Sequence, residues 1–414
     1  MRAKSYALVT AGYWAFTVTD GALRLLVLLH FHELGYSPVS IAFLFLAYEF
    51  MGIVTNLVGG WVGSRTGLAK TLIAGLAIQI GALLALTLQQ DEWSALISVP
   101  FVMGVQALSG VAKDLTKMSS KSAVKFVAGD GDGALFRLVA VLTGSKNALK
   151  GVGFFVGAAL LSWIGYRPAL WALAGLVAAA LVAVLVLLDE DIGRASRKRS
   201  LRSALSPSVA INRLSAARLF LFGSRDIWFV VALPVFLDDV LGWTFEGIGA
   251  FLAAWVIGYG IVQSVAPRFI RRQGENLAGE VSAARWLALV LGVVSAAIAI
   301  AVSVDPDDGS GTVATVAVVG GLVLFGVVFA LNSSLHSFLI LAYSQGDDVA
   351  TDVGFYYSAN ATGRLVGTLL SGVLALWGGL EGALWGSTLF VAVTWLLTRR
   401  LPTASEPALS TSEV

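Results

Sequence analysis

The sequence predicts an all-helical, polytopic membrane protein with about twelve transmembrane helices in two pseudo-symmetric six-helix bundles. Composition is the first observation behind this prediction, because 57% of the 414 residues are hydrophobic and only 13% are charged. Soluble domains carry about 25% charged residues, so this chain has too few polar residues to cover a water-facing surface. A helix needs about 20 apolar residues to cross the hydrocarbon core, and 414 residues with short loops therefore allow about a dozen crossings.

The second observation is the order of apolar and polar segments along the chain. We predict spans at residues 6–30, 39–62, 70–90, 94–115, 138–164, 168–188, 214–240, 245–267, 281–304, 313–341, 353–377 and 380–398. The stretch 116–137 is amphipathic, with Lys117, Lys121 and Lys125 at four-residue spacing. We expect this stretch to lie along the membrane surface.

The longest polar gap, 189–213, lies midway along the chain and separates six predicted spans from six. Its basic run is typical of an orientation signal that contacts lipid headgroups. We therefore predict an N-terminal six-helix bundle (1–190), a cytoplasmic linker (191–213), a C-terminal six-helix bundle (214–402) and a disordered cytoplasmic tail (403–414).

The third observation is a repeat between the two halves. Three sets of residues recur at offsets of 208, 207 and 214: Gly52-Ile53-Val54 with Gly260-Ile261-Val262, Gly35-Tyr36-Ser37 with Gly242-Trp243-Thr244, and Lys150, Gly153, Trp163 and Gly165 with Arg364, Gly367, Trp377 and Gly379. Nearly constant offsets across three pairs of spans indicate a parallel duplication.

The loops differ sharply in charge, which predicts the orientation. Alternate loops, counted from the N-terminus, hold 19 Lys and Arg residues, whereas the opposite loops hold one, Arg167, together with acidic residues. Loops rich in Lys and Arg stay in the cytoplasm. We therefore expect both termini to be cytoplasmic, which requires an even number of spans.

Nine charged residues stand at or near the middle of predicted spans, where each costs about 2.5–3.5 kcal/mol. Six are basic and three are acidic: Arg24, Lys146, Lys150, Arg218, Arg225, Arg364, Asp20, Glu49 and Asp226. Three acids cannot neutralise six bases, so the surplus favours an anionic substrate bound by the bases. The three acids are interpreted as counter-ions or proton-coupling residues.

Lys146 and Lys150 stand four residues apart on one helical face without an adjacent acid, and like charges at this spacing repel each other. One interpretation is an internal salt bridge to one of the three acids. The interpretation that we favour is an anion seated between the fifth and eleventh spans.

Two acidic residues have a base nearby in the sequence. Asp20 and Arg24 are four residues apart, and a simple pairing explains them as well as a role in the site does. Arg225 and Asp226 are adjacent, so we expect them to point to different sides of their helix and not to pair.

Polar side chains in the spans are weaker candidates, because they more often join helices than contact a ligand. Asn147 and Asn360 are added to the substrate-binding set, and the secondary polar candidates are Gln106, Lys113, Lys117, Gln263, Asn332 and His336. Small residues allow helices to approach closely, and we expect that role for Gly151, Gly153 and Gly157.

Several classes of function lack the residues that they need. The chain has no cysteine and only three histidines, too few and too scattered for a closed metal cage. It has no phosphate-binding Gly-x-x-x-x-Gly-Lys motif, no His-Glu-x-x-His motif and no nucleophile elbow. We expect no catalytic residues, no cofactor, no bound metal and no nucleic-acid partner.

The turn after the second predicted span reads Gly60-Trp61-Val62-Gly63-Ser64-Arg65-Thr66-Gly67-Leu68-Ala69-Lys70. It resembles the loop signature of the major facilitator superfamily, Gly-x-x-x-Asp-Arg-x-Gly-Arg-x-Lys. Ser64 replaces the usual aspartate and Leu68 replaces an arginine, so the salt bridge that the family builds there is incomplete. The resemblance implies the major facilitator fold.

Longer segments resemble the ArsJ family of organoarsenical exporters: 13–38, 48–61, 107–122, 142–155 and 215–234. The resemblance covers most of the chain outside the loops near residues 129, 195 and 308. It implies export of 1-arseno-3-phosphoglycerate across a bacterial inner membrane, which confers arsenate resistance. That ester forms when glyceraldehyde-3-phosphate dehydrogenase uses arsenate in place of phosphate, so this dehydrogenase is the implied functional partner.

The charge surplus agrees with this implied substrate. By analogy with phosphomonoesters, the ester carries roughly three negative charges. The absence of cysteine argues against recognition of thiophilic arsenite. A trivalent anion leaving a cell that is negative inside needs no coupling ion, so we predict electrogenic uniport by a monomer, with Glu49 the first candidate proton site if coupling exists.

Two other functions stay open. The first is transport of another organophosphate or drug-like anion on the same fold, which the charged residues fit equally well. The second is a membrane-embedded enzyme acting on lipid phosphates. It would need Lys113, Asp114 and His336 to converge at the cytoplasmic side.

Overall fold

The computed structural model describes residues 2–66, 68–127, 132–188, 208–270, 277–307, 309–344 and 349–403. Within these ranges it describes side chains except those of residues 2–6, 57–66, 68, 118, 121–127, 132–144, 267–270 and 349–351. The side chains of the loop signature before Ala69, the linker up to residue 207 and the predicted tail from residue 404 therefore lie outside the described residues.

The chain folds into helices that follow the predicted spans. The first half contains α1 (Arg2–Glu33), α2 (Pro38–Thr66), α3 (Leu68–Leu86), α4 (Ala95–Val127), α5 (Asp132–Ile164) and α6 (Tyr166–Leu187). The second half contains α7 (Val209–Phe229), α8 (Ala232–Asp239), α9 (Phe245–Ile270), α10 (Leu277–Ser303), α11 (Thr312–Tyr343) and α12 (Val349–Arg399).

Eleven segments of the described chain are long and apolar enough to cross a membrane, and the last of them holds two crossings. The short α8 continues α7, so Val209–Asp239 is a single segment. The last segment, Asp352–Arg399, is 48 residues long, and the backbone inside α12 leaves the helical conformation at Gly378 and Gly379. One crossing needs only about 20 residues, so the pieces on either side of this break are separate spans. The prediction of an all-helical protein with twelve spans is confirmed.

The turns of the two halves repeat the same backbone geometry. Gly35 and Gly242 follow the first span of each half with φ of 79° and 63°, and Gly165 and Gly379 follow the fifth with φ of 80° and 58°. Positive φ is a conformation that glycine adopts without steric cost. These are the glycines that the sequence repeat aligns, so the structure supports the duplication.

Glycines on α5 and α12 bring each helix against the first span of its half. A Cβ atom at Gly153 would lie 2.3 Å from the carbonyl oxygen of Val18, and one at Gly157 would lie 2.2 Å from that of Ala22. At Gly367, the counterpart of Gly153, a Cβ would lie 2.7 Å from the carbonyl oxygen of Gly223. The predicted role of the α5 glycines in close helix contact is confirmed, and it places Lys150 beside α1.

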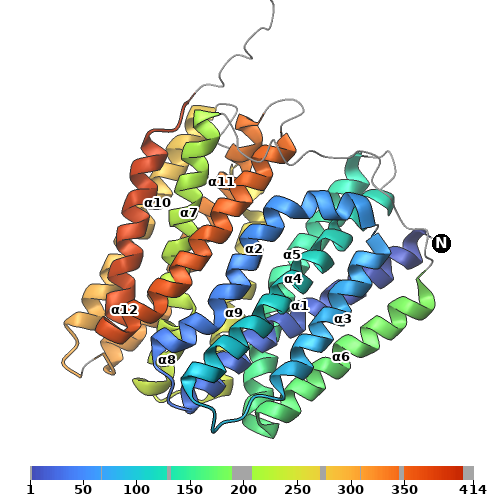
Figure 1. Ribbon diagram of the computed structural model, residues 1–414. Coiled ribbons are helices and arrows are strands. Elements are labelled where there is room, and N and C mark those ends of the chain that lie inside the picture. Colours follow the sequence, from blue (N-terminus) through green and yellow to red (C-terminus); the bar gives the residue numbers. More distant parts are fainter. Residues whose placement is uncertain are drawn as a thin grey trace, which may run out of the picture.

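The two halves lie side by side, with α1 to α6 in one and α7 with α10 to α12 in the other (Figure 1). Helices α5 and α9 pack against each other across the boundary, as do α2 and α12. The most enclosed segments are α1 and α7–α8, in which 83% and 72% of the apolar window is buried, against 28–50% elsewhere. Charged residues on these helices therefore face protein and the boundary between the halves.

The structure corrects two boundaries. Helix α4 continues without a break to Val127 and α5 begins at Asp132, so the described parts of 116–137 extend these two helices and do not form a separate helix on the membrane surface. Helix α7 begins at Val209, four residues before the predicted end of the linker at residue 213. In both places the end of the helix is polar, so the sequence pattern indicates a loop or a surface segment. The helices in this fold extend beyond the apolar core.

Candidate functional site

Buried ion pairs join the two halves at mid-depth, and Glu49 on α2 is at their centre. Its side chain is 1% exposed. Its Oε1 atom accepts a hydrogen bond from Arg24 Nη1 on α1 at 2.8 Å and another from Arg364 Nη2 on α12 at 2.6 Å. The second contact links the first half to the second, so it must break if α2 and α12 separate.

Arg364 also contacts Asp226 on α7, and it therefore bridges two buried carboxylates. Its Nε atom donates to Asp226 Oδ2 at 3.2 Å. The other oxygen of Asp226 accepts from Arg225 Nε at 2.6 Å. One guanidinium thus connects Glu49 of the first half to Asp226 of the second.

The third acid, Asp20 on α1, lies beside this network. The hydroxyl of Tyr48 donates to Asp20 Oδ1 at 2.5 Å, and Lys150 Nζ lies 4.0 Å from Asp20 Oδ2. Lys113 Nζ stands 4.0 Å from the centre of the Tyr48 ring. A small cavity is lined by Asp20 and Tyr48, together with Arg24, Phe45 and Gln106.

The structure corrects one interpretation and one prediction. Arg24 does not pair with Asp20 on its own helix but with Glu49 on α2. Arg225 and Asp226 do contact each other, although adjacent residues point about 100° apart on a helix. The long arginine side chain reaches back to the carboxylate across this angle.

Arg218 differs from the other bases because its neighbours are neutral. It is 4% exposed, and Nη1 donates to the backbone oxygen and the hydroxyl of Ser333 at 2.9 and 3.1 Å, while Nε donates to Asn360 Oδ1 at 3.1 Å. Its guanidinium lies 3.9 Å from the centre of the Phe222 ring and 5.1 Å from that of Tyr356. Among the described residues, no carboxylate forms a salt bridge with it.

A second polar connection crosses the boundary between the halves. Asn147 Nδ2 on α5 donates to Gln263 Oε1 on α9 at 3.2 Å, and Gln263 Nε2 donates to the Ser333 hydroxyl at 3.4 Å. Since Ser333 also contacts Arg218, this chain of amides connects α5 to the Arg218 cluster. Lys146, one residue before Asn147, is exposed.

The remaining candidates lie farther from the ion pairs. Lys117 contacts Asp114 Oδ1 and Asn56 Oδ1, both at 3.4 Å. Asn332 and His336 are 0% exposed on α11, and their side-chain nitrogen and oxygen atoms have no hydrogen-bond partner among the described residues.

Tyr48 takes part in the site, although the sequence did not place it there, and Thr55 and Asp114 form a further buried contact between α2 and α4. Asp114 is 3% exposed and accepts a hydrogen bond from Thr55. Its position one residue after Lys113 was the available signal, and it is a buried acid in addition to the three predicted ones. In the described part of the chain, no hydrogen bond joins Asp114 to His336, so the convergence that a lipid-phosphate enzyme needs is not found.

Twelve spans in two repeated halves, with buried charges meeting between them, define a polytopic membrane transporter. The sequence profile of the Major Facilitator Superfamily matches residues 9–340. The chain therefore belongs to this superfamily.

Solved structures of transporters share the fold. A bacterial homologue of the iron transporter ferroportin in an inward-facing state superposes with a TM-score of 0.69 at 18% identity, covering 96% of this chain and 98% of that chain. A point mutant of the nucleoside transporter NupG superposes with a TM-score of 0.73 at 15% identity and the same coverage. No curated protein sequence matches the chain. At these identities the structural likeness shows the fold, and the family indicates a transporter rather than an enzyme.

Proposed function

We propose that this transporter exports an anionic organoarsenical ester, 1-arseno-3-phosphoglycerate, by alternating access. The observation that supports it most is the convergence of bases from both halves. Arg24 on α1 and Arg364 on α12 both donate to Glu49 Oε1, at 2.8 and 2.6 Å, and Lys150 on α5 lies 4.0 Å from Asp20 Oδ2. An anion could replace these carboxylates as the partner of the three bases, whereas the bases would repel a cation.

The ion pairs suggest how binding is coupled to movement. The cavity beside Asp20, Arg24 and Tyr48 is small, so on this proposal a three-carbon ester with two oxyanion groups enters when α2 and α12 move apart. That movement breaks the contact between Glu49 and Arg364. Glu49 keeps Arg24 and Arg364 keeps Asp226, but each buried charge loses one of its two partners, which is costly at low dielectric. An oxyanion that binds Arg364 in a bidentate manner replaces the lost carboxylate, so the substrate favours the separation.

The choice of an arsenical among anions rests on the resemblance of five long segments to the ArsJ family. On this proposal the protein acts in a bacterial inner membrane with both termini in the cytoplasm. It acts as a monomer beside a glyceraldehyde-3-phosphate dehydrogenase that makes the ester. The resemblance also sets the direction of transport, because the same basic residues would suit an importer.

We expect arsenate resistance only when both proteins are present. An arsenate-sensitive host would express this chain alone, the dehydrogenase alone, or both, and growth would be measured over a range of arsenate concentrations. Resistance conferred by this chain alone would point to arsenate itself as substrate. No resistance with both proteins, at normal membrane abundance, would point to another organophosphate or drug-like anion.

The membrane potential alone should drive the export. A potential of about 100 mV, negative inside, contributes about 2.3 kcal/mol for each negative charge moved outward, and about 7 kcal/mol for three. Each acid lies beside a base. Arg364 is 2.6 Å from Glu49 and 3.2 Å from Asp226, and Lys150 is 4.0 Å from Asp20. A proton would first have to displace that base.

The measurement is transport in inverted vesicles with the voltage and the pH gradient imposed separately. We expect the imposed voltage alone to drive transport of the ester into the vesicles. Transport driven by a pH gradient at zero voltage, and lost in Glu49→Gln, would instead identify Glu49 as a coupling residue.

A further inference from the structure

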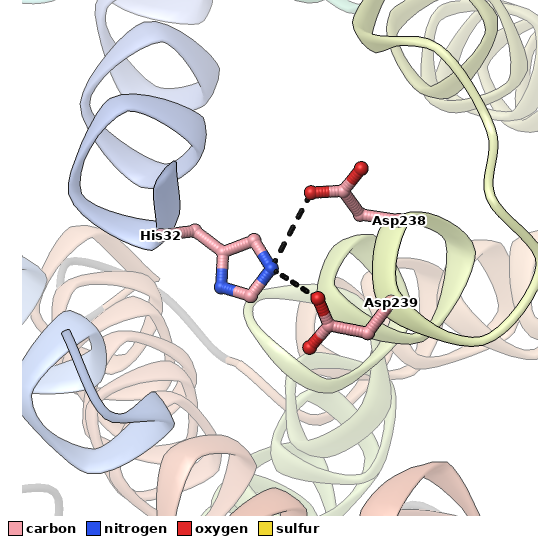
Figure 2. A group of neighbouring side chains, drawn as sticks. All are labelled: His32, Asp238 and Asp239. Carbon is pink, nitrogen blue, oxygen red and sulfur yellow. Dashed lines mark hydrogen bonds and ion pairs between the residues drawn. The ribbon is translucent and has the colours of Figure 1, made fainter. Parts of the chain in front are cut away.

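The two halves also contact each other at the end of the bundle where the acidic loops lie. His32 is in the last turn of α1, and Asp238 and Asp239 are the last two residues of α8. His32 Nε2 lies 2.9 Å from Asp239 Oδ1 and 3.4 Å from Asp238 Oδ2. Figure 2 shows both carboxylates pointing toward the same ring nitrogen.

His32 Nε2 is within hydrogen-bond distance of Asp239 Oδ1, but the three side chains together have a geometry that suits a metal ion. A single imidazole N–H cannot be directed well at two carboxylates at once. Donor atoms that each lie about 2.0–2.2 Å from one metal ion stand roughly 2.9–3.5 Å apart. The measured separations from the nitrogen fall in this range, and all three donor atoms lie within 4.8 Å of one another.

The local charge also favours a cation. Two carboxylates face one imidazole, and among the described residues no Lys or Arg forms a salt bridge with either of them. Arg167 is the basic residue that the sequence places in the acidic loops, and it donates to the backbone oxygen of Gln89 instead. With His32 neutral, the three side chains carry two negative charges, which a divalent ion would balance.

We propose that His32, Asp238 and Asp239 bind a divalent transition-metal ion such as Zn²⁺, which joins the ends of the two halves. An imidazole nitrogen with two carboxylate oxygens suits zinc and its neighbours, whereas Ca²⁺ and Mg²⁺ prefer oxygen ligands alone. The side chains are 13%, 27% and 57% exposed, so the ion can enter and keep water ligands. Because α1 belongs to the first half and α8 to the second, a bound ion opposes their separation at this end.

A similar pair within one half provides the matched control. His30 Nε2, two residues earlier on α1, lies 3.4 Å from Asp91 Oδ1. This histidine stacks on the Tyr166 ring at 3.8 Å and faces one carboxylate, which is 55% exposed. Asp91→Asn removes a histidine–aspartate contact at the same end without touching the proposed ligands.

The first test is titration of the purified full-length protein with Zn²⁺ by calorimetry. We expect one ion per chain, with affinity weakened about tenfold or more in His32→Gln and in Asp238→Asn. Asp91→Asn should bind as the parent does. Absence of binding, or equal binding by the parent and His32→Gln, would overturn the proposal.

The second test measures the separation of the halves. The chain has no cysteine, so a single Leu28→Cys substitution on α1 gives a unique label site. Leu28 lines a small cavity between the halves together with Val230 and Leu252. Zn²⁺ should slow its labelling by a membrane-impermeant maleimide several-fold, and should have no effect when His32→Gln is also present. Equal rates with and without Zn²⁺ in the Leu28→Cys protein would show that no ion joins the halves.

Discussion

Arg364→Ala should abolish export and arsenate resistance while the protein still inserts into the membrane. Arg364 is the one residue in the described network that contacts carboxylates of both halves, Glu49 at 2.6 Å and Asp226 at 3.2 Å. Removing one partner of a buried ion pair costs about 3–5 kcal/mol, which corresponds to roughly 10²–10⁴ in an equilibrium constant. The same change removes a bidentate donor for the substrate, so both binding and movement are affected.

Two further variants make this result interpretable. Arg364→Lys keeps the charge but loses the planar fork, so we expect partial activity. Arg399→Ala, at the end of the last span, removes an arginine that lies over the Trp395 ring at 4.7 Å, and it should transport normally. Export by Arg364→Ala within a few-fold of the parent, at equal membrane abundance, would contradict the proposed role.

Lys150→Ala should reduce export by about 100-fold or more. Lys150 lies 4.0 Å from Asp20 Oδ2, so it could act only as a counter-ion or could also bind the substrate. A double variant, Asp20→Asn with Lys150→Gln, separates these roles, because it removes both charges and leaves neither unpaired.

The expected result is that the double variant stays inactive, because the substrate still lacks the ammonium group. Efflux of the ester and protein abundance would be measured for both single variants and the double variant. Recovery of transport in the double variant would show that Lys150 acts only as a counter-ion of Asp20. Near-normal efflux by Lys150→Ala would refute its part in anion binding.

The spans and the duplication could be predicted from sequence because both depend on local properties. Apolar length sets the number of crossings, and positive φ selects glycine at equivalent turns such as Gly165 and Gly379. The mid-depth charges could also be recognised, since an ionised side chain in a span is costly and is retained for a reason.

The partners of these charges could not be predicted, because partner choice depends on how helices rotate and pack. Arg24 and Asp20 share a helix, yet Arg24 contacts Glu49 on α2. The contact between His32 and Asp239 joins residues 207 apart in the chain. Neither the spacing along a helix nor the loop charges indicates that α1 ends beside α8. The substrate-binding residues stay a prediction until the variants are measured.

The most direct measurement of the central claim is accumulation of arsenic by inverted vesicles that contain this protein. The ester would be generated outside the vesicles from glyceraldehyde-3-phosphate, NAD⁺, arsenate and the dehydrogenase, under an imposed voltage, positive inside. The account predicts that arsenic accumulates only with the complete mixture, and that Arg364→Ala vesicles accumulate none. Equal accumulation from arsenate without the dehydrogenase, or no accumulation from the complete mixture by intact protein, would contradict it.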